Sequence, residues 1–299
     1  MSEDAIKNVA ESTAELVRQL VAPTTLDLTR DQQRAAVVAV PAGITLKSIK
    51  PFLDEYLDRP ERIKGTAVLE ELDAFCAHAN RFKDGRSAIF GTRADCRLQA
   101  VFDYHEEPGK PRFGSHRAVY AAPLSEEWEA WSKVNGKEIS QALLAELIED
   151  RIADVKEPTG ADEFYDMHEL AGKLGTTFCS PARLLELSRG LAMTVEQTVV
   201  NVVDPGTGER ALVFTEEQKE KGTTQRLKIP GLFMLAIPVF RGGAVHNIAA
   251  RLRYRVAGGE ITWRIQLYRM DLVLDEAFDA ICDTAQQQTQ LPLFRGKPE

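Results

Sequence analysis

The sequence lacks any hydrophobic run long enough to cross a lipid bilayer. A spanning helix needs about 20 consecutive apolar residues, whereas the longest apolar stretch, residues 232–240, is much shorter and contains Pro238. Residues 1–10 are acidic and polar, whereas a secretory signal peptide begins with basic residues and continues with apolar ones. We therefore expect a cytoplasmic protein without a membrane partner.

Cysteines are few and far apart. None of the four belongs to a C-x-x-C pair; they are Cys76, Cys96, Cys179 and Cys282. A structural zinc site usually takes its cysteines in closely spaced pairs, and disulfides are rare in reducing compartments. We interpret all four as small buried hydrophobic residues, and we predict neither a metal site nor a cofactor.

The motifs of common catalytic sites are also missing. No Gly-Lys pair is followed by Ser or Thr, which excludes a P-loop, and neither G-x-S-x-G nor H-E-x-x-H occurs. Asp103 and His105 share one face of an expected strand, and an acid with a histidine can bind a metal or transfer protons. The same pair also fits a polar strand end that runs into a turn. We predict no catalytic residues, and a protein that is not an enzyme.

Composition sets broad limits on size and partners. The 299 residues are 44% hydrophobic and carry a formal net charge of −8. That suffices for one large domain or two smaller ones with cores. The negative charge argues against a protein that is coated with nucleic acid over its whole surface.

Hydrophobic periodicity differs between regions of the chain. Apolar residues recur every three or four positions, as in amphipathic helices, in residues 3–21, 66–82, 140–152 and 162–190. They alternate with polar residues, as in strands, in residues 96–105, 115–121, 244–256 and 260–268. Because helices and strands are grouped and do not alternate, the pattern favours an α+β fold.

Three parts are expected. Residues 1–155 form a helical and hairpin N-terminal part, and residues 156–287 form an antiparallel, β-rich C-terminal part that ends in a closing helix. A linker is indicated near residues 155–160 by Pro158 and Gly160. Residues 288–299, rich first in Gln and then in Pro and Gly, are interpreted as a flexible tail.

The tail contains a peptide that resembles a known docking motif. Residues 290–294 read Gln-Leu-Pro-Leu-Phe, which is similar to the pentapeptide by which bacterial replication and repair proteins bind the DNA polymerase sliding clamp. Pro292 departs from the Ser or Asp that is commonest in the middle. The resemblance implies that Gln290 hydrogen-bonds at the pocket rim, that Leu293 and Phe294 fill an apolar pocket, and that Leu291 lies beside them. Alternatively, the three apolar side chains fold back on their own domain or on a neighbouring subunit.

A basic strand pair is the second candidate site. Arg251, Arg253 and Arg255 share one face of an expected strand, and Arg264 joins them across a hairpin if the apolar faces align. Residues 221–270 carry a net charge of +8, which leaves −16 for the remainder. Two interpretations are open: a surface that binds the phosphates of nucleic acid or a nucleotide, or electrostatic pairing with acidic helices of the same or a neighbouring subunit. We favour the second.

Three further segments carry a family resemblance. Residues 115–120 followed by 123–131, residues 237–240 with Gly242 and Gly243, and residues 250–255 together resemble the YfdQ-like family of phage and prophage proteins. The resemblance covers nearly the whole chain and implies a phage origin, a domain of unknown function and no known activity.

These observations lead to one functional expectation and two alternatives. We expect a non-enzymatic, phage-derived, self-assembling accessory protein that binds the host sliding clamp through Gln290, Leu291, Leu293 and Phe294. The first alternative is a protein that binds nucleic acid or a nucleotide through Arg251, Arg253, Arg255 and Arg264. The second is a purely structural homo-oligomer, such as a ring or shell, in which these arginines face a neighbour.

Overall fold

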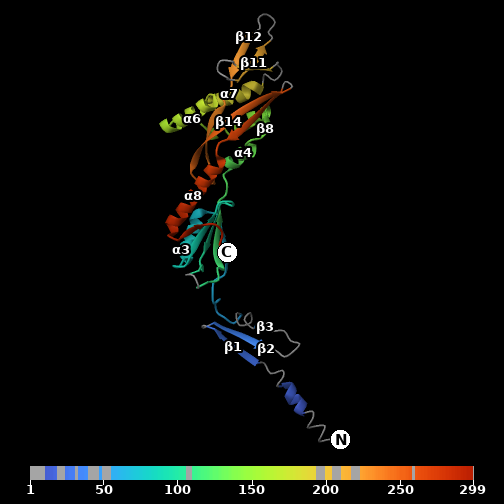
Figure 1. Cartoon of the computed structure of the whole chain (residues 1–299), viewed down its shortest axis with the longest axis vertical. Helices are drawn as coiled ribbons and strands as arrows, with labels where there is room; N and C mark the ends of the chain where they lie inside the picture. The colour runs from blue at the N-terminus through green and yellow to red at the C-terminus, as the bar shows by residue number, and fades with distance from the viewer. Residues whose placement is uncertain are drawn as a thin grey trace. The chain divides into compact units, whose positions relative to one another are not determined.

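The chain divides into two compact units, residues 1–64 and residues 65–299. The structure is a computed structural model, and Figure 1 shows its elements. It describes residues 11–18, 24–30, 33–39, 47–48, 55–105, 110–192, 199–203, 210–216, 223–257 and 260–298. Helices and strands are grouped along the chain, which confirms the α+β fold. No helix within these ranges is long and apolar enough to cross a bilayer.

The first unit contains a helix and a small sheet. Residues 11–18 are helical; the rest of the helix expected over residues 3–21 lies outside the described residues. The sheet has the strand order β1-β2-β3, with both pairs antiparallel. Its strands are β1 (Thr24–Arg30), β2 (Gln33–Ala39) and β3 (Lys47–Ser48).

The second unit contains two five-stranded sheets, of which we call the first sheet I. Its strand order is β16-β5-β6-β7-β4. The strands are β4 (Gly65–Leu69), β5 (Ala88–Thr92), β6 (Arg97–Val101), β7 (His116–Ala121) and β16 (Leu293–Arg295). The central three strands run antiparallel, and the pair β6 and β7 is the hairpin expected from residues 96–105 and 115–121, while β4 and β16 pair in parallel with β7 and β5. The two parallel strands form the edges of sheet I.

Two helices contribute to the core of sheet I. They are α3 (Leu72–Phe82) and α8 (Met270–Thr289). They contact each other, and Phe75 and Phe278 are buried in one cluster with Ile89 of β5. A single helix over residues 66–82 was therefore a wrong prediction, because residues 65–69 are a strand. Their pairing with β7 is parallel and remote in sequence, so local periodicity does not reveal it.

Sheet II has the strand order β8-β15-β14-β13-β9, with all neighbours antiparallel. Its strands are β8 (Glu138–Ser140), β9 (Val155–Lys156), β13 (Leu232–Pro238), β14 (Val245–Ala257) and β15 (Glu260–Leu267). Residues 155–156 therefore belong to a sheet and not to a linker, and the unit boundary falls at residue 64 and not near residue 155. Pairing with β13 buries Val155, which accounts for the difference.

Both faces of sheet II carry helices. The helices nearby are α4 (Glu126–Val134), α5 (Gln141–Asp150), α6 (Ala161–Leu174) and α7 (Pro181–Ala192). On the inner face, Trp131 of α4 packs with its ring centre 5.9 Å from that of Phe233. On the outer face, Met167 of α6 is buried with Leu232 and Met234. Successive strand residues point to opposite faces, so β13 has apolar side chains on both of its faces: Phe233 on the inner face, and Leu232 and Met234 on the outer face.

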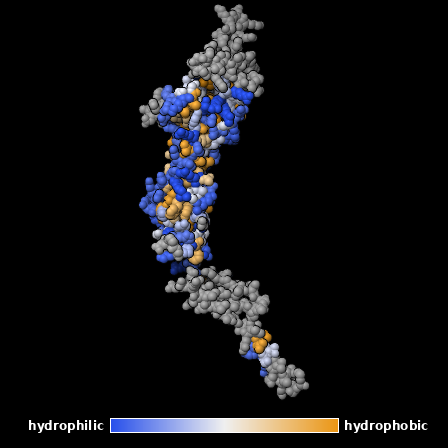
Figure 2. All heavy atoms as spheres, viewed as in Figure 1, coloured by the Kyte–Doolittle hydropathy of each residue, from blue (hydrophilic) through white to orange (hydrophobic). Residues whose placement is uncertain are grey.

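The second unit also contains a three-stranded antiparallel sheet with the order β10-β11-β12. Its strands are β10 (Val199–Val203), β11 (Arg210–Glu216) and β12 (Thr223–Lys228). Hydrophilic and apolar residues are interspersed over the view of the second unit in Figure 2. A short 3-10 helix, η1 (Ile152–Asp154), precedes β9.

Serine caps fix the starts of α4 and α5. The Ser125 hydroxyl accepts a hydrogen bond from the Trp128 amide, and the Ser140 hydroxyl accepts one from Leu143. The Ser125 hydroxyl also donates to the Pro238 carbonyl at 2.6 Å. A serine cap satisfies an amide that the helix leaves unpaired, and Ser125 additionally attaches α4 to the end of β13.

One buried amide joins three elements beneath sheet II. The Gln141 side chain donates to the Ser188 carbonyl at 2.7 Å and accepts a hydrogen bond from the Trp263 indole. All three residues are buried. A buried polar group without its partner costs about 1–3 kcal/mol, so the two hydrogen bonds of Gln141 hold α5, α7 and β15 together.

We predict that Gln141→Ala lowers the free energy of unfolding by about 2–4 kcal/mol, because the Trp263 indole and the Ser188 carbonyl both lose their partner. Urea unfolding followed by circular dichroism measures the change. The control is Gln287→Ala on the exposed side of α8, for which we expect less than about 0.5 kcal/mol. Equal losses in the two variants would contradict the role of Gln141.

Candidate functional site

The four arginines of the basic strand pair lie on one face of sheet II. Arg253 is directly opposite Arg264, while Arg251 and Arg255 are opposite Gln266 and Thr262. Directly opposed residues of an antiparallel pair point to the same face. We call the surface formed by Arg251, Arg253, Arg255 and Arg264 the arginine face.

Alternation along the two strands determines which face the arginines occupy. Leu252, Trp263 and Ile265 are buried on the inner face, so the residues between them point outward. Arg253, Arg255 and Arg264 are exposed. Arg251 is half-buried and is opposite Leu232, at the margin of the patch that α6 covers.

The arginines that form ion pairs with carboxylates lie elsewhere. Among the described residues they include Arg18, Arg93, Arg112, Arg151, Arg183, Arg189 and Arg295. No carboxylate in the described ranges forms an ion pair with the arginine face, although Glu138 of β8 is opposite Arg264 in the sheet. Like charges on neighbouring strands repel, so an anion bound between Arg253 and Arg264 would stabilise this surface.

Glu138 is a neighbour of the arginine face that the sequence does not reveal. Strand β8 has only three residues and joins the sheet through pairs with Thr262, Trp263 and Arg264. Three residues are too few for a two-residue alternation to be recognised. Glu138 alone does not balance the four guanidinium groups of the arginine face.

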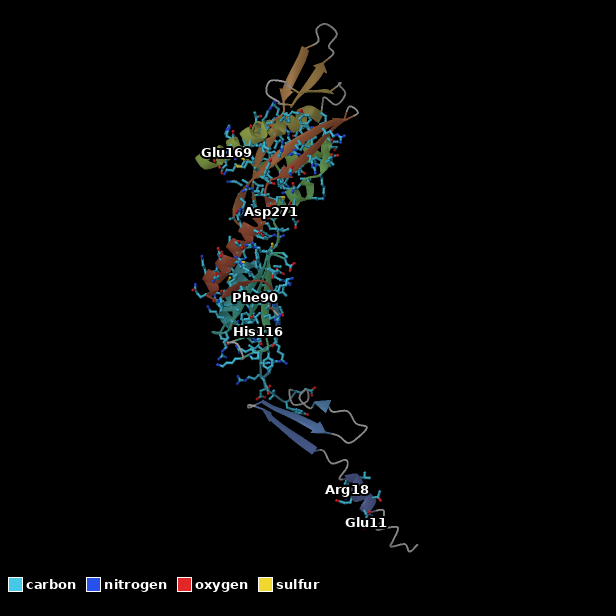
Figure 3. All side chains as sticks on the ribbon, in the orientation of Figure 1. Glu11, Arg18, Phe90, His116, Glu169 and Asp271 are labelled. Carbon is cyan, nitrogen blue, oxygen red and sulfur yellow. The ribbon has the colours of Figure 1, made fainter. Side chains whose placement is uncertain are left out.

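The second candidate, the C-terminal peptide, is built into sheet I. Gln290 ends α8 in the left-handed conformation (φ 57°), and Leu291 is only 6% exposed within the core. The Ile89 amide donates to the Pro292 carbonyl at 2.9 Å. Phe294 is 48% exposed, with its ring centre 5.5 Å from that of Phe90, which Figure 3 labels.

The flexible tail expected over residues 288–299 is therefore a wrong prediction for the described residues. Arg295 forms an ion pair with Asp279 at 2.9 Å, Lys297 forms one with Asp95 at 3.2 Å, and the Thr92 hydroxyl donates to Gly296. The tail composition is polar, but burial of Leu291 and pairing with β5 outweigh the entropy of a free end. Leu291 and Leu293 pack on their own domain.

A pocket opens beside this segment, at the C-terminal end of α8. It is lined by Asp283, Gln286, Gln287, Gln290, Leu291 and Pro292. Three amide side chains and one carboxylate offer hydrogen bonds, but the lining includes no histidine, cysteine or second acid that could form an acid–base pair.

Asp103 and His105 accept hydrogen bonds from backbone amides that precede or begin β7. The Asp103 carboxylate accepts hydrogen bonds from the amides of Ser115 (3.0 Å) and His116 (2.9 Å), and His105 Nδ1 accepts one from the Arg112 amide (3.1 Å). Burial, the largest single effect, disfavours the charged carboxylate, but all the hydrogen bonds that the carboxylate accepts, led by those from the His116 and Ser115 amides, together outweigh it, so the pKa of Asp103 lies below its usual value. These contacts fit a polar strand end that runs into a turn.

The cysteines offer no reactive thiol in the described core. Cys76, Cys179 and Cys282 are buried, and burial raises their thiol pKa values to about 11, about 12 and about 11. A thiol is nucleophilic and binds metal as the thiolate. Across the described ranges, no three His, Cys, Asp or Glu residues are grouped so that they could hold a metal ion.

We predict that Asp103→Asn destabilises the protein at neutral pH and has little effect in acid. A carboxyl whose pKa is lowered on folding stabilises the fold above its unfolded pKa of about 3.9, and this contribution is lost as the pH falls through the folded pKa. Urea unfolding at neutral and acidic pH measures the difference, with exposed Asp150→Asn as the control. A constant difference across pH would contradict the role of the carboxylate.

Comparison with known proteins places this chain in a family without an assigned activity. No curated protein and no solved structure matches it. A family model described as an uncharacterized conserved protein (DUF2303) matches residues 10–298, which is nearly the whole chain. The protein thus belongs to the DUF2303 family of uncharacterized conserved proteins.

Proposed function

We propose that this protein binds the phosphates of nucleic acid through the arginine face and that it is not an enzyme. The observation that supports the proposal is the exposed pair Arg253 and Arg264, directly opposed on sheet II and flanked by Arg251 and Arg255. No carboxylate within the described residues forms an ion pair with them. This favours an external anion over the intramolecular pairing that the sequence suggested.

The chemistry of the face suits phosphate. Arginine presents a planar fork of donors that can hold a phosphate through two parallel hydrogen bonds. Alternate residues along β14 are about 6.7 Å apart, so Arg251, Arg253 and Arg255 form a row that can follow successive phosphates of one strand. Thr262 and Gln266, on the same face, add neutral donors and acceptors.

The charge distribution supports local binding. Residues 221–270 carry +8 within a chain of net charge −8, and all four residues of the arginine face belong to this basic segment. Each neutralised phosphate releases counterions, which makes affinity fall steeply with salt. A strong salt dependence is therefore the expected signature of the site.

We predict that the double variant Arg253→Gln/Arg264→Gln binds fluorescent single-stranded and duplex oligonucleotides at least tenfold more weakly than the wild type at low salt. The slope of log affinity against log salt should become shallower by about 0.7–0.9 for each phosphate that the variant no longer neutralises. Fluorescence anisotropy over a salt series measures both quantities.

The matched control is Arg183→Gln/Arg189→Gln, which removes the same charge from two arginines of α7, one half-buried and one exposed, that already pair with Glu186 and Glu149. It should retain affinity and slope. If both double variants lose affinity equally, the effect is one of net charge and the arginine face is not the site. No binding by the wild type at low salt would overturn the proposal.

A second candidate is the expected docking to the bacterial sliding clamp. It is supported by the exposure of Gln290 and Phe294, which the motif resemblance assigns to the pocket rim and the pocket. Docking requires β16 to leave β5, because Leu293 packs on the core of sheet I. We propose a phage origin on the YfdQ-like resemblance, and such a protein could use a host replication protein as partner.

If clamp docking occurs, Phe294→Ala should abolish it, since the motif resemblance places that ring in the apolar pocket, whereas Arg253→Gln/Arg264→Gln should leave it intact. Biosensor titration on immobilised clamp measures the affinity. Binding should depend little on salt because the contact is apolar. Failure of the wild type to bind, or unchanged binding by Phe294→Ala, would exclude this function.

A further inference from the structure

Within the described part of the chain, each edge strand of sheet I has one neighbouring strand, so half of its backbone groups face away from the sheet. The Gly65 amide donates to the Ser115 carbonyl of the β7 side, and alternate residues of a parallel strand bond to a given neighbour. The amides and carbonyls of Thr66 and Val68 therefore point away from β7. Edge strands of this kind are ready templates for pairing with another chain.

The same reasoning applies to β16 at the other edge. The Pro292 carbonyl accepts from Ile89, and the Gly296 amide donates to Gly91. The backbone groups of Leu293 and Arg295, which lie between these bonded positions, therefore point away from β5. In the described part of sheet I, each edge strand therefore has backbone donors and acceptors that point outward from the sheet, β4 on one edge and β16 on the other.

Each edge also carries an exposed apolar side chain, and both lie on one face. Val68 is 76% exposed and Phe294 is 48% exposed. They are the ends of a single row across the sheet, which runs Val68, Val119, Gln99, Phe90, Phe294. Covering both side chains would remove apolar surface from water.

Charges beside the two edges are complementary. Glu70 and Glu71 follow β4 and are exposed. Arg295 and Lys297 lie at the corresponding end of β16 and are exposed as well, although they already form ion pairs with Asp279 and Asp95 of their own chain. If β4 and β16 paired in parallel, their C-terminal ends would lie side by side, so Glu70 and Glu71 would face Arg295 and Lys297.

We propose that copies of this chain assemble head to tail through sheet I, with β4 of one copy paired in parallel with β16 of the next. Val68 is opposite Phe294 in this register. The Val68 amide donates to the Leu293 carbonyl, and the Arg295 amide donates to the Val68 carbonyl. The contact joins two different surfaces, so repeated pairing produces a closed ring or an open filament.

Cysteine cross-linking tests the register directly. Val68 and Phe294 are four strand spacings apart within one chain, about 19 Å, whereas a disulfide needs Cβ atoms about 3.8 Å apart. Mixing Val68→Cys with Phe294→Cys should give a covalent dimer on oxidation, and the double variant should give a ladder of multimers on a non-reducing gel. The oxidised wild type controls for the native cysteines.

Light scattering tests the assembly without cross-linking. Val68→Asp should reduce the mass of the wild-type assembly to that of one chain, and since this side chain is largely exposed, the variant should still fold. Leu143→Asp on α5, which replaces another exposed apolar residue, should leave the mass unchanged. Arg253→Gln/Arg264→Gln should also leave it unchanged, which separates this contact from one made by the arginine face.

A wild-type protein that has the mass of one chain at every concentration would overturn the proposal. So would disulfides that form only between two copies of the same single variant, because that result requires a symmetric contact. Loss of assembly in both Val68→Asp and Leu143→Asp would show that the effect is not specific to the β4 edge.

Discussion

Burial of Leu291 is the constraint on which the second unit depends. Helix α8 follows β15 of sheet II directly, and its last turn delivers Leu291 into the core that contains Ile89 of sheet I. Gln290 adopts the left-handed conformation there, which costs a non-glycine residue roughly 1–2 kcal/mol. Burying a leucine side chain contributes about 1.5–3 kcal/mol, which offsets that strain. The final residues thereby close a sheet that begins at Gly65.

Because Leu291 is buried, the two candidate sites differ in what must change in the structure before a partner binds. The arginine face is preformed, since its side chains point outward from a paired hairpin and nothing must unfold before an anion binds. The C-terminal peptide must leave β5 and expose Leu291 before it can occupy another pocket. That exposure alone would weaken docking about ten- to a hundredfold, given about 1.5–3 kcal/mol for the side chain. A five-residue peptide supplies roughly −8 kcal/mol at best, so little affinity would remain.

The sequence predicts the elements whose information is local. Alternation in residues 244–256 and 260–268 identifies β14 and β15, and the serines before α4 and α5 mark where those helices start. It does not predict β4, β9 or β16, which are two to five residues long and pair with strands far away in the chain. Strand β12 is polar in composition and is defined by its pairing with β11. The arginine face follows from alternation alone, whereas Glu138 beside it depends on a long-range pair.

The edges of sheet I are a consequence of the same long-range pairing. Because β5 and β7 run in the same direction and each added strand is parallel to its neighbour, β4 and β16 also run in the same direction, so a translated copy continues the sheet by parallel pairing. A modest basic surface in an acidic chain would gain from that repetition. Several arginine faces on one assembly would meet a long polyanion together, and after the first contact each further one is intramolecular, with an effective concentration set by geometry. Weak sites of four arginines could then bind a nucleic acid firmly without any single copy carrying a large positive charge.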